Sequence, residues 1–293
     1  MTRLKPYNTF SASIKIPKIV LQIASILAFF SHQLIVIVAT KIFTTPPKFI
    51  TPKRELVMLN SSQKSFLKVE KIDKEIEILS YGFSKKKVLL AHGWAGRSTH
   101  LFAFAHKLLE KGFMVISFNA PAHGKSTGKT TNLIEYIESI KAINEEFGPF
   151  EAAIGHSFGS VALLNIASEK QIFKSIVTIG AADQISTIIE NFIKSLHLKP
   201  IIAEKMKTHI QKKWNIILDD FSSSKVAQKI KIPVLVIHDI NDGDVAVSCA
   251  QKIRQNLEKG SLLITNNLGH TKILRDNETV KKVVSFIIKK EKK

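Results

Sequence analysis

Most of the chain alternates between apolar runs of strand length and longer segments with helical spacing. The strand-like runs are SFLKVEK, EIEILSYG, KVLLAHG, FMVISFNA, EAAIGHS, SIVTIGA, PVLVIHD and SLLITNN. The segments long enough for helices lie at 98–111, 131–146, 158–169, 245–257 and 271–289. Strands that alternate with helices form mostly parallel sheets covered on both faces. The pattern therefore predicts an α/β fold, doubly wound, around a mostly parallel sheet of about eight strands.

One segment breaks this alternation. Residues 182–230 are too long for a simple crossover between strands, and the apolar residues of ISTIIENFIKSLHL recur near helical spacing. We therefore predict a small helical lid inserted at about 182–230. It should lie over the ends of the strands, where open α/β sheets bind ligands.

The N-terminal segment, residues 1–45, has a different pattern. Residues 19–40 read IVLQIASILAFFSHQLIVIVAT, without a charged residue, glycine or proline. A helix needs about 20 apolar residues to cross a bilayer, so this run is long enough. Basic residues flank it on both sides, which leaves its orientation open under the positive-inside rule. These residues are Arg3, Lys5, Lys15 and Lys18 before the run, and Lys41, Lys48, Lys53 and Arg54 after it.

Three interpretations of this run compete. A cleaved signal peptide has an apolar region of about 7 to 15 residues, which is shorter than this run. A helix that lies on the protein or in the membrane interface should carry a continuous polar face, and the few polar residues form none. The pattern favours a single membrane-spanning helix at about 19–40 and a membrane-associated protein. The alternative is a cytoplasmic protein with a buried or peripheral N-terminal helix.

A proline-rich stretch, TTPPKFITPKR, follows the apolar run. A helix cannot continue through these prolines, so residues 46–55 are predicted to be a linker. The remaining residues, 56–293, are sufficient for one domain, because single domains commonly extend to about 250 residues.

Composition narrows the functional classes. With 45% hydrophobic residues the chain is not of the disordered class, and its single cysteine, Cys249, excludes a disulfide framework. The net charge of +19 comes almost entirely from lysine, and no basic motif is interleaved with aromatic residues. Arginine is the preferred reader of phosphates and bases, so we expect no nucleic-acid partner. A solvated lysine-rich surface is the simpler interpretation, and attraction to anionic lipid is a second one.

The stretch EAAIGHSFGS places Ser157 between Gly155 and Gly159, directly after an apolar run. In a sharp turn from strand to helix the central residue is strained, and its neighbours must lack bulk so that strand and helix can pass closely. This arrangement is described for nucleophile elbows, in which the serine stands at the strand tip before a helix N-terminus. A glycine-flanked serine alone is also compatible with an ordinary tight turn.

Four further motifs accompany this stretch, and together they resemble the α/β-hydrolase superfamily from about Val57 to the C-terminus. LLAHGWAG is similar to the turn after that family's third strand, and FNAPAHGKSTG to the segment after the next strand. GHSFGS resembles its nucleophile elbow, HDINDGDV its acid turn and NLGHTKIL its histidine loop. The five motifs occur in the family's order. Two positions depart from its pattern: Asn119 stands where aspartate is frequent, and Ala122 where glycine is usual.

The chemistry of acyl transfer and this resemblance together assign a role to each motif. A serine hydroxyl is a poor nucleophile until a nearby base takes its proton, and His270 is our candidate for the base of Ser157. His270 follows the last predicted strand, as the order serine, acid, histidine requires. The resemblance selects Asp242 as the acid that orients His270, with Asp244 as the rival. It also implies that the N–H groups of Trp94 and Phe158 form the oxyanion hole.

The remaining acidic and histidine residues of these motifs have simpler interpretations. Asp239 and His238 are expected to brace the acid turn through backbone hydrogen bonds. His92, His123 and His156 are expected to pack within turns. No zinc-ligand spacing and no phosphate-binding loop is present in the sequence, so we predict neither a metal nor another cofactor.

The sequence therefore predicts a serine hydrolase that cleaves an ester, a thioester or a related acyl bond. Its substrate would be a small acyl compound, with a lipid-like compound among the candidates, and its N-terminal helix would attach it to a membrane. The alternative is a non-catalytic binding protein, tethered to the membrane, that uses the same fold. Neither hypothesis fixes the oligomeric state.

Overall fold

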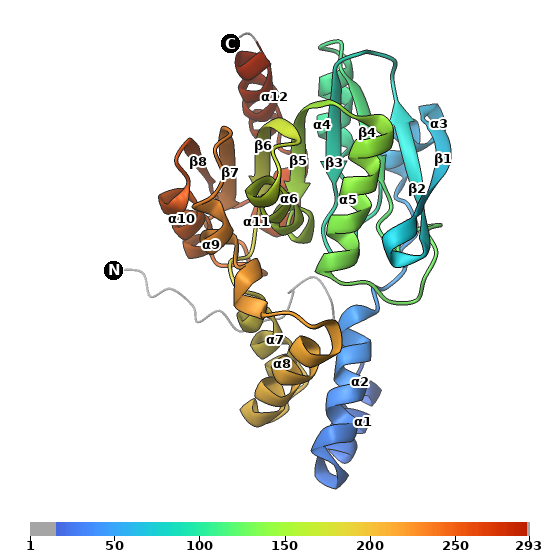
Figure 1. Cartoon of the computed structure of the whole chain (residues 1–293), viewed down its shortest axis with the longest axis vertical. Helices are drawn as coiled ribbons and strands as arrows, with labels where there is room; N and C mark the ends of the chain where they lie inside the picture. Colours follow the sequence, from blue (N-terminus) through green and yellow to red (C-terminus); the bar gives the residue numbers. More distant parts are fainter. Residues whose placement is uncertain (1–15, 292–293) are drawn as a thin grey trace.

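An eight-stranded sheet forms the centre of the computed structural model, which describes residues 16–291 (Figure 1). Its strand order is β1-β2-β4-β3-β5-β6-β7-β8. Strand β2 is antiparallel to both of its neighbours, β1 and β4, and the strands from β4 to β8 are parallel. The prediction of an α/β fold with a mostly parallel sheet of about eight strands is confirmed. The strands are β1 (Gln63–Val69), β2 (Lys74–Tyr81), β3 (Lys87–Ala91), β4 (Met114–Phe118), β5 (Phe150–His156), β6 (Phe173–Ile179), β7 (Val234–Asp239) and β8 (Gly260–Thr265).

The burial of each strand follows its place in the sheet. Every residue of β7 is buried, because helices cover both faces of the central strands. The edge strand β1 alternates between exposed and more buried residues, since only one of its faces meets the core. The continuous apolar runs of the sequence are thus the central strands.

Helices cover the two faces of the sheet in separate hydrophobic clusters. One face packs against α5 (Leu133–Phe147), α6 (Phe158–Glu169) and α10 (Val247–Asn256). The other face packs against α4 (Phe102–Leu109) and α12 (Asn277–Glu291), next to α3 (Leu56–Ser61). The parallel strands therefore end together at one edge, and the loops that follow them meet there.

The predicted helix at 271–289 is interrupted. A short helix, α11 (Gly269–Lys272), and the 3-10 turn η4 (Ile273–Arg275) precede α12. Asp276 separates them, because its carboxylate accepts hydrogen bonds from the N–H and the hydroxyl of Thr279, at 2.8 and 2.7 Å, and so caps α12. The remaining 3-10 turns are η1 (Lys53–Glu55), η2 (Glu70–Ile72) and η3 (Leu218–Phe221).

A helical lobe extends from the edge of the sheet at which the parallel strands end (Figure 1). Two of its helices, α7 (Ile185–Ser195) and α8 (Pro200–Trp214), belong to the segment between β6 and β7, which ends with η3 and α9 (Ser223–Ala227). We call α7 to α9 the helical insert. The other two are N-terminal, α1 (Lys18–Phe30) and α2 (His32–Thr44). The four helices share one cluster of buried side chains, which includes Ala24, Ile35, Val36, Ala39, Ile189, Phe192, Ile202 and Met206.

The prediction of one membrane-spanning helix at 19–40 is wrong. Within residues 16–291 no helix has both the length and the apolar character needed to span a bilayer. Ser31 has an extended backbone, and its hydroxyl accepts a hydrogen bond from Leu34 N–H at 3.2 Å. The serine thus ends α1 and caps α2, so both helices can pack against the insert. Three of the basic residues predicted to flank the run, Arg3, Lys5 and Lys15, lie outside the described residues.

The segment after α2 is attached to the sheet by a buried ion pair. Residues 46–52 contain no helix or strand, and Glu55 at the end of η1 is buried. Its carboxylate accepts hydrogen bonds from Arg97 Nε at 2.6 Å and from Thr99 Oγ1 at 2.7 Å. Both partners lie in the loop after β3, so the N-terminal segment is fixed to that loop.

Of the two departures from the family pattern, the structure explains Asn119 but not Ala122. Asn119 Nδ2 donates a hydrogen bond to Glu77 Oε2 at 2.5 Å, and Asn119 Oδ1 accepts one from Ser98 N–H at 2.8 Å. All three residues are buried, so an aspartate at position 119 would face a second carboxylate. Ala122 adopts a left-handed backbone with φ 66°, the conformation for which glycine is the usual choice.

The hydrogen bond between Asn119 and Glu77 predicts that a single substitution at position 119 strongly destabilises the fold. We expect Asn119→Asp to lower the free energy of unfolding by about 2 to 4 kcal/mol at neutral pH, because it replaces a buried hydrogen bond with repulsion between carboxylates. Urea denaturation measures the loss. The double variant Glu77→Gln with Asn119→Asp restores a donor opposite the new carboxylate and should recover more than half of it. Equal stability of the single variant and the wild type would contradict this explanation.

Candidate active site

Ser157 lies in the turn between β5 and α6. Its backbone has φ 50° and ψ −115°, a conformation that is strained for a residue with a side chain. A Cβ atom at Gly155 would lie 2.7 Å from Ser160 N and Cα, and one at Gly159 would lie 2.3 Å from Ala91 O. Both glycines are therefore required by the close passage of strand and helix, which was the reason for predicting an elbow here.

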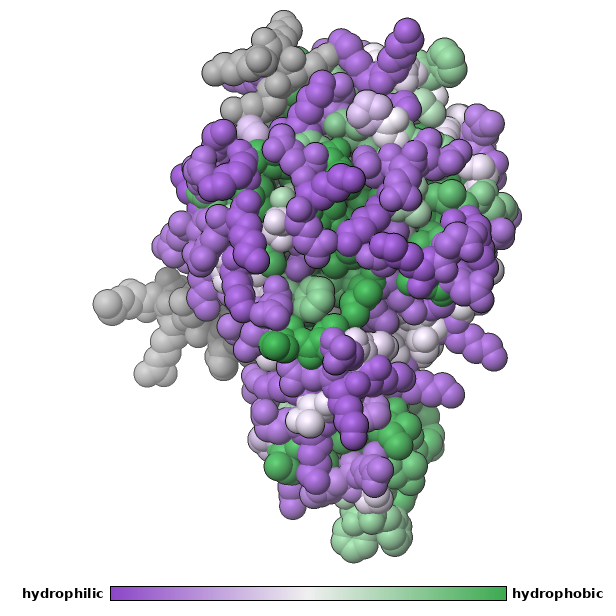
Figure 2. All heavy atoms as spheres, in the orientation of Figure 1, coloured by the Kyte–Doolittle hydropathy of each residue, from purple (hydrophilic) through white to green (hydrophobic). Residues whose placement is uncertain are grey.

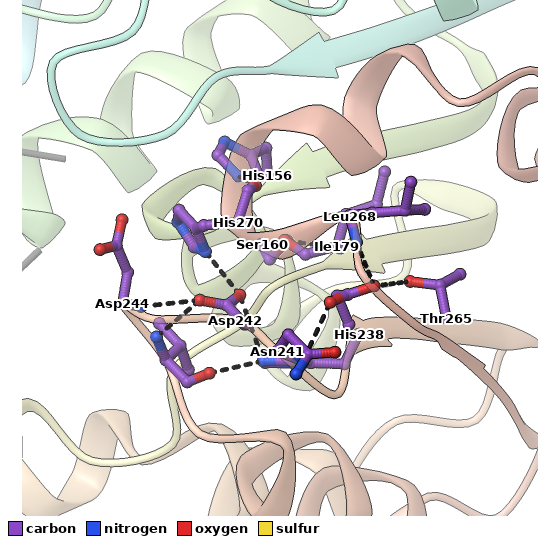
Figure 3. Close-up of polar contacts among 12 residues, drawn as sticks. His156, Ser160, Ile179, His238, Asn241, Asp242, Asp244, Thr265, Leu268 and His270 are labelled. Carbon is purple, nitrogen blue, oxygen red and sulfur yellow. Dashed lines mark hydrogen bonds and ion pairs between the residues drawn. The ribbon is translucent and has the colours of Figure 1, made fainter. Parts of the chain in front are cut away.

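The acid turn and the histidine loop meet beside this elbow. Asp242 follows β7, and His270 lies in α11 after β8. His270 Nδ1 donates a hydrogen bond to Asp242 Oδ2 at 2.7 Å (Figure 3). The other carboxylate oxygen of Asp242 accepts hydrogen bonds from the N–H groups of Asp244 and Val245, at 2.8 and 2.9 Å. The structure thus brings Asp242 to His270, and Asp244 contributes its backbone to holding that carboxylate in place.

Asp239 connects the two loops. Its Oδ2 accepts hydrogen bonds from Thr265 Oγ1 at 2.7 Å and from Leu268 N–H at 3.1 Å, and its Oδ1 accepts one from Asn241 N–H at 2.9 Å. His238 Nε2 donates to Val245 O at 2.9 Å. Both side chains brace the acid turn, and Asp239 in addition holds the loop that carries His270.

The pair of Asp242 and His270 is electrostatically coupled. Burial raises the pKa of Asp242, but hydrogen bonds from His238, His270 and the Val245 N–H outweigh burial and hold it below its ordinary value. Burial lowers the pKa of His270, but the hydrogen bond and the negative charge of Asp242 outweigh burial and raise it above 6.5. Asp242 is therefore ionised at neutral pH, and it stabilises a positive charge on His270.

Ser157 and His270 line the same cavity. The N–H of Ser157 donates to Ile179 O at 2.8 Å. Gly180, which follows Ile179, packs against the His270 ring, since a Cβ atom at this glycine would lie 3.0 Å from His270 Cε1. The ring of His156, adjacent to the serine, contacts the ring of His270 and donates from Nε2 to its carbonyl at 3.0 Å. Within residues 16–291 no hydrogen bond joins Ser157 Oγ to His270. The structure brings the two residues to one cavity wall but does not bond them.

The predicted oxyanion donors, Trp94 and Phe158, follow two neighbouring strands, β3 and β5. Gly155 of β5 pairs with Ala91 of β3, so the loop that carries Trp94 begins next to the elbow. Phe158 is the first residue of α6, where an N–H group has no carbonyl partner within its own helix. The rings of Trp94 and Phe158 meet edge to face, with their centroids 5.6 Å apart.

His92 holds the loop that carries Trp94. Its Nδ1 donates to Gly93 O at 2.7 Å, and its Nε2 accepts from Ala120 N–H at 3.0 Å. Tyr136 Oη donates to His92 O at 2.6 Å. The pKa of His92 lies well below 6.5, mainly because the ring is buried. The ring is therefore neutral, with Nδ1 as the donor and Nε2 as the acceptor. The position of Trp94 thus depends on the loop after β4 and on α5.

A cavity of about 380 Å³ opens at Ser157. It is largely apolar and lies between the sheet edge and the helical lobe. The helical insert and the elbow were predicted to line it. The contribution of α2 was not predicted, because nothing in the sequence connects residues 43 and 44 with Ser157. Residues of its wall include Phe43, Trp94, Phe158, Ile185, Trp214 and Leu218.

Comparison with known protein families agrees with this geometry. A family described as "alpha/beta hydrolase fold" matches residues 86–212, and one described as "TAP-like protein" matches residues 213–292. The chain belongs to the α/β-hydrolase superfamily. Comparison with curated protein sequences finds no match.

Solved structures of other α/β-hydrolases are similar in fold at low sequence identity. A putative lipase from Acinetobacter baumannii is 19% identical with a TM-score of 0.62, over 84% of this chain and 99% of that one. An esterase from Pyrococcus furiosus is 19% identical with a TM-score of 0.65, over 84% and 98%. A membrane phospholipase A, described as a bacterial virulence factor, is 17% identical with a TM-score of 0.63, over 94% and 97%. At these identities the likeness shows the fold alone.

The other histidines of the α/β-hydrolase motifs are buried: His92 and His123 lie in loops as predicted, whereas His156 is the last residue of strand β5 rather than part of a turn. Burial lowers the pKa of His123 to about 4, and it lowers the pKa of His156 well below 6.5. The part of the chain that the structure describes contains no group of three histidine, cysteine or acidic residues that could hold a metal ion.

Proposed function

We propose that this α/β-hydrolase is a serine hydrolase that cleaves a carboxylic ester, a thioester or a related acyl bond through an acyl-enzyme. The observation that carries the proposal is the 2.7 Å hydrogen bond from His270 Nδ1 to the buried Asp242, because His270 lines the same cavity as the strained Ser157. An acid that engages Nδ1 leaves Nε2 as the nitrogen that receives a proton.

Each step of this acyl transfer can then be assigned to a residue of the site. Ser157 Oγ attacks the acyl carbon while His270 Nε2 takes the hydroxyl proton, and Asp242 stabilises the imidazolium. The N–H groups of Phe158 and Trp94 bind the oxyanion. His270 gives its proton to the leaving group, and a water that loses a proton to His270 then releases the acid and restores Ser157.

The missing hydrogen bond between Ser157 and His270 is compatible with this mechanism. Catalytic hydrogen bonds are frequently long in the free enzyme and shorten in the complex with substrate. His270 lies in the four-residue helix α11, which is held by hydrogen bonds from Leu268 N–H to Asp239, from His270 Nδ1 to Asp242 and from His156 Nε2 to His270 O. The proposal requires this loop to bring His270 Nε2 within hydrogen-bond distance of Ser157 Oγ in the substrate complex.

The cavity supports an apolar acyl group as the substrate. Its wall is formed mainly by aromatic and aliphatic side chains, and we propose that the helical insert acts as its lid. Solved structures of similar fold include proteins named as a lipase and as esterases, which is consistent with an ester substrate.

A panel of p-nitrophenyl esters of graded chain length tests both parts of the proposal. We expect kcat/KM to rise about tenfold or more from the acetyl to the hexanoyl ester, since each buried methylene contributes about 0.8 kcal/mol. We also expect a fluorophosphonate probe to label Ser157, as mapped by peptide mass spectrometry. A chain that hydrolyses no ester and takes no label would instead be the non-catalytic binding protein.

A further inference from the structure

The N-terminal helix α1 is apolar on two opposite sides, and only one of them is covered. Its inner side faces the helical insert and buries Ala24. Its outer side exposes Ile19, Ile23, Ile26 and Phe30, at 59%, 47%, 57% and 77% of their surface. This spacing of four, three and four residues places the four side chains in one stripe along the helix. A large apolar stripe exposed on a folded protein indicates a binding surface.

The stripe continues over the turn between the helices and onto α2. The two helices lie side by side and meet at Ser31, at the end of the lobe farthest from the sheet (Figure 1). Phe29, just before this turn, is 86% exposed, and its ring meets that of Phe30 edge to face. On α2, Leu34 and Ile37 are about half exposed, at 44% and 48%. Figure 2 shows hydrophobic residues gathered at this end of the lobe. We call α1 and α2 the N-terminal hairpin.

The charges of the hairpin select the kind of partner. No acidic residue precedes Glu55 in the sequence, whereas Lys18 and Lys41 are exposed on the hairpin itself. A second copy of the chain on this surface would bring the basic residues of two hairpins together without acidic partners. An anionic lipid surface offers negative headgroups for the lysines and an acyl region for the exposed isoleucines and phenylalanines.

We propose that the N-terminal hairpin docks the protein on the surface of an anionic lipid bilayer. The hairpin lies in the interface, with Phe29 and Phe30 inserted below the headgroups, and neither helix spans the membrane. Its inner side stays packed on the insert, so docking does not require the lobe to open. The same helix α2 carries Phe43 and Thr44 into the cavity wall, which holds the cavity close to the lipid.

Sedimentation with lipid vesicles tests the docking. The full-length protein is mixed with vesicles of phosphatidylcholine, with and without phosphatidylglycerol. We expect the wild type to sediment with the anionic vesicles and far less with the neutral ones. The double variant Phe29→Ser with Phe30→Ser should bind the anionic vesicles at least about tenfold more weakly, because it removes two large apolar side chains from the interface. Phe83→Ser is the matched control, since Phe83 is fully exposed in the turn between β2 and β3.

The outcomes separate docking from the alternatives and from the proposed reaction. Wild type that stays in the supernatant, equal binding to both kinds of vesicle, or full binding by the double variant would each overturn the proposal. So would a wild-type dimer in light scattering that the double variant converts to a monomer, because the hairpin would then bind a second copy. Hydrolysis of a soluble short-chain ester is measured in parallel. Its absence in every variant would count against the serine hydrolase and leave the docking result intact.

Discussion

Ser157→Ala is expected to lower kcat/KM for an activated ester by about 10,000-fold or more and to abolish labelling by a fluorophosphonate. The reason is that the variant keeps the cavity, the oxyanion donors and the pair of Asp242 and His270, but loses the atom that forms the acyl-enzyme. Initial rates with p-nitrophenyl esters and gel-based detection of the probe measure the two effects.

Ser168→Ala provides the control for this variant. Ser168 lies near the other end of α6, and its hydroxyl donates to Asn165 O at 2.7 Å, within the same helix. We expect wild-type turnover and labelling from it. Undiminished hydrolysis by the Ser157 variant would exclude this serine as the nucleophile and with it the proposed mechanism.

Asp242→Asn is expected to lower kcat by about 1,000- to 10,000-fold, because the amide neither fixes the tautomer of His270 nor stabilises its imidazolium. The variant should also change the pH profile. In the wild type Asp242 raises the pKa of His270 above 6.5, so activity increases with pH as His270 loses its proton in this higher range. Without the charge of Asp242 the pKa falls, and the acidic limb of the remaining activity moves to lower pH.

Asp244→Asn separates the two candidate acids. Asp244 raises the pKa of His270 only through its charge, and the hydrogen bond to His270 comes from Asp242. We expect its kcat to stay within about threefold of the wild type, as for a partly exposed charge. If Asp244→Asn loses activity while Asp242→Asn does not, then Asp244 is the acid.

The sheet was predictable because most of its strands are central and parallel, and such strands have a clear hydrophobic pattern in the sequence. Central parallel strands are buried on both faces, so they appear as short continuous apolar runs, such as VLVI in β7. Helix α6 begins at Phe158 and ends at Glu169, as its pattern predicted, because the elbow fixes its start. Positions 155, 157 and 159 were predictable for a similar reason, since close passage of strand and helix leaves little choice of residue.

The N-terminal hairpin could not be predicted from hydrophobicity alone. A run that is apolar all round is typical of a spanning helix, and the sequence does not reveal that the insert covers one side of it. The only local indication of a break between two helices was Ser31, because serine is a good helix cap, but serine also occurs inside helices. The contact between Asn119 and Glu77 and the place of α2 in the cavity wall join segments that are distant in the sequence. Their pairing depends on the assembled sheet and lobe.

The place of α2 in the cavity wall affects how the protein should be prepared. Deleting the first 44 residues would remove the apolar helices α1 and α2. It would also remove Phe43 and Thr44 from the wall of the cavity that Ser157 lines and uncover Ile189, Phe192 and Met206 of the insert. The shortened protein would then tend to self-associate and to accept different compounds from the intact one. Preparation of the whole chain keeps this wall of the cavity intact.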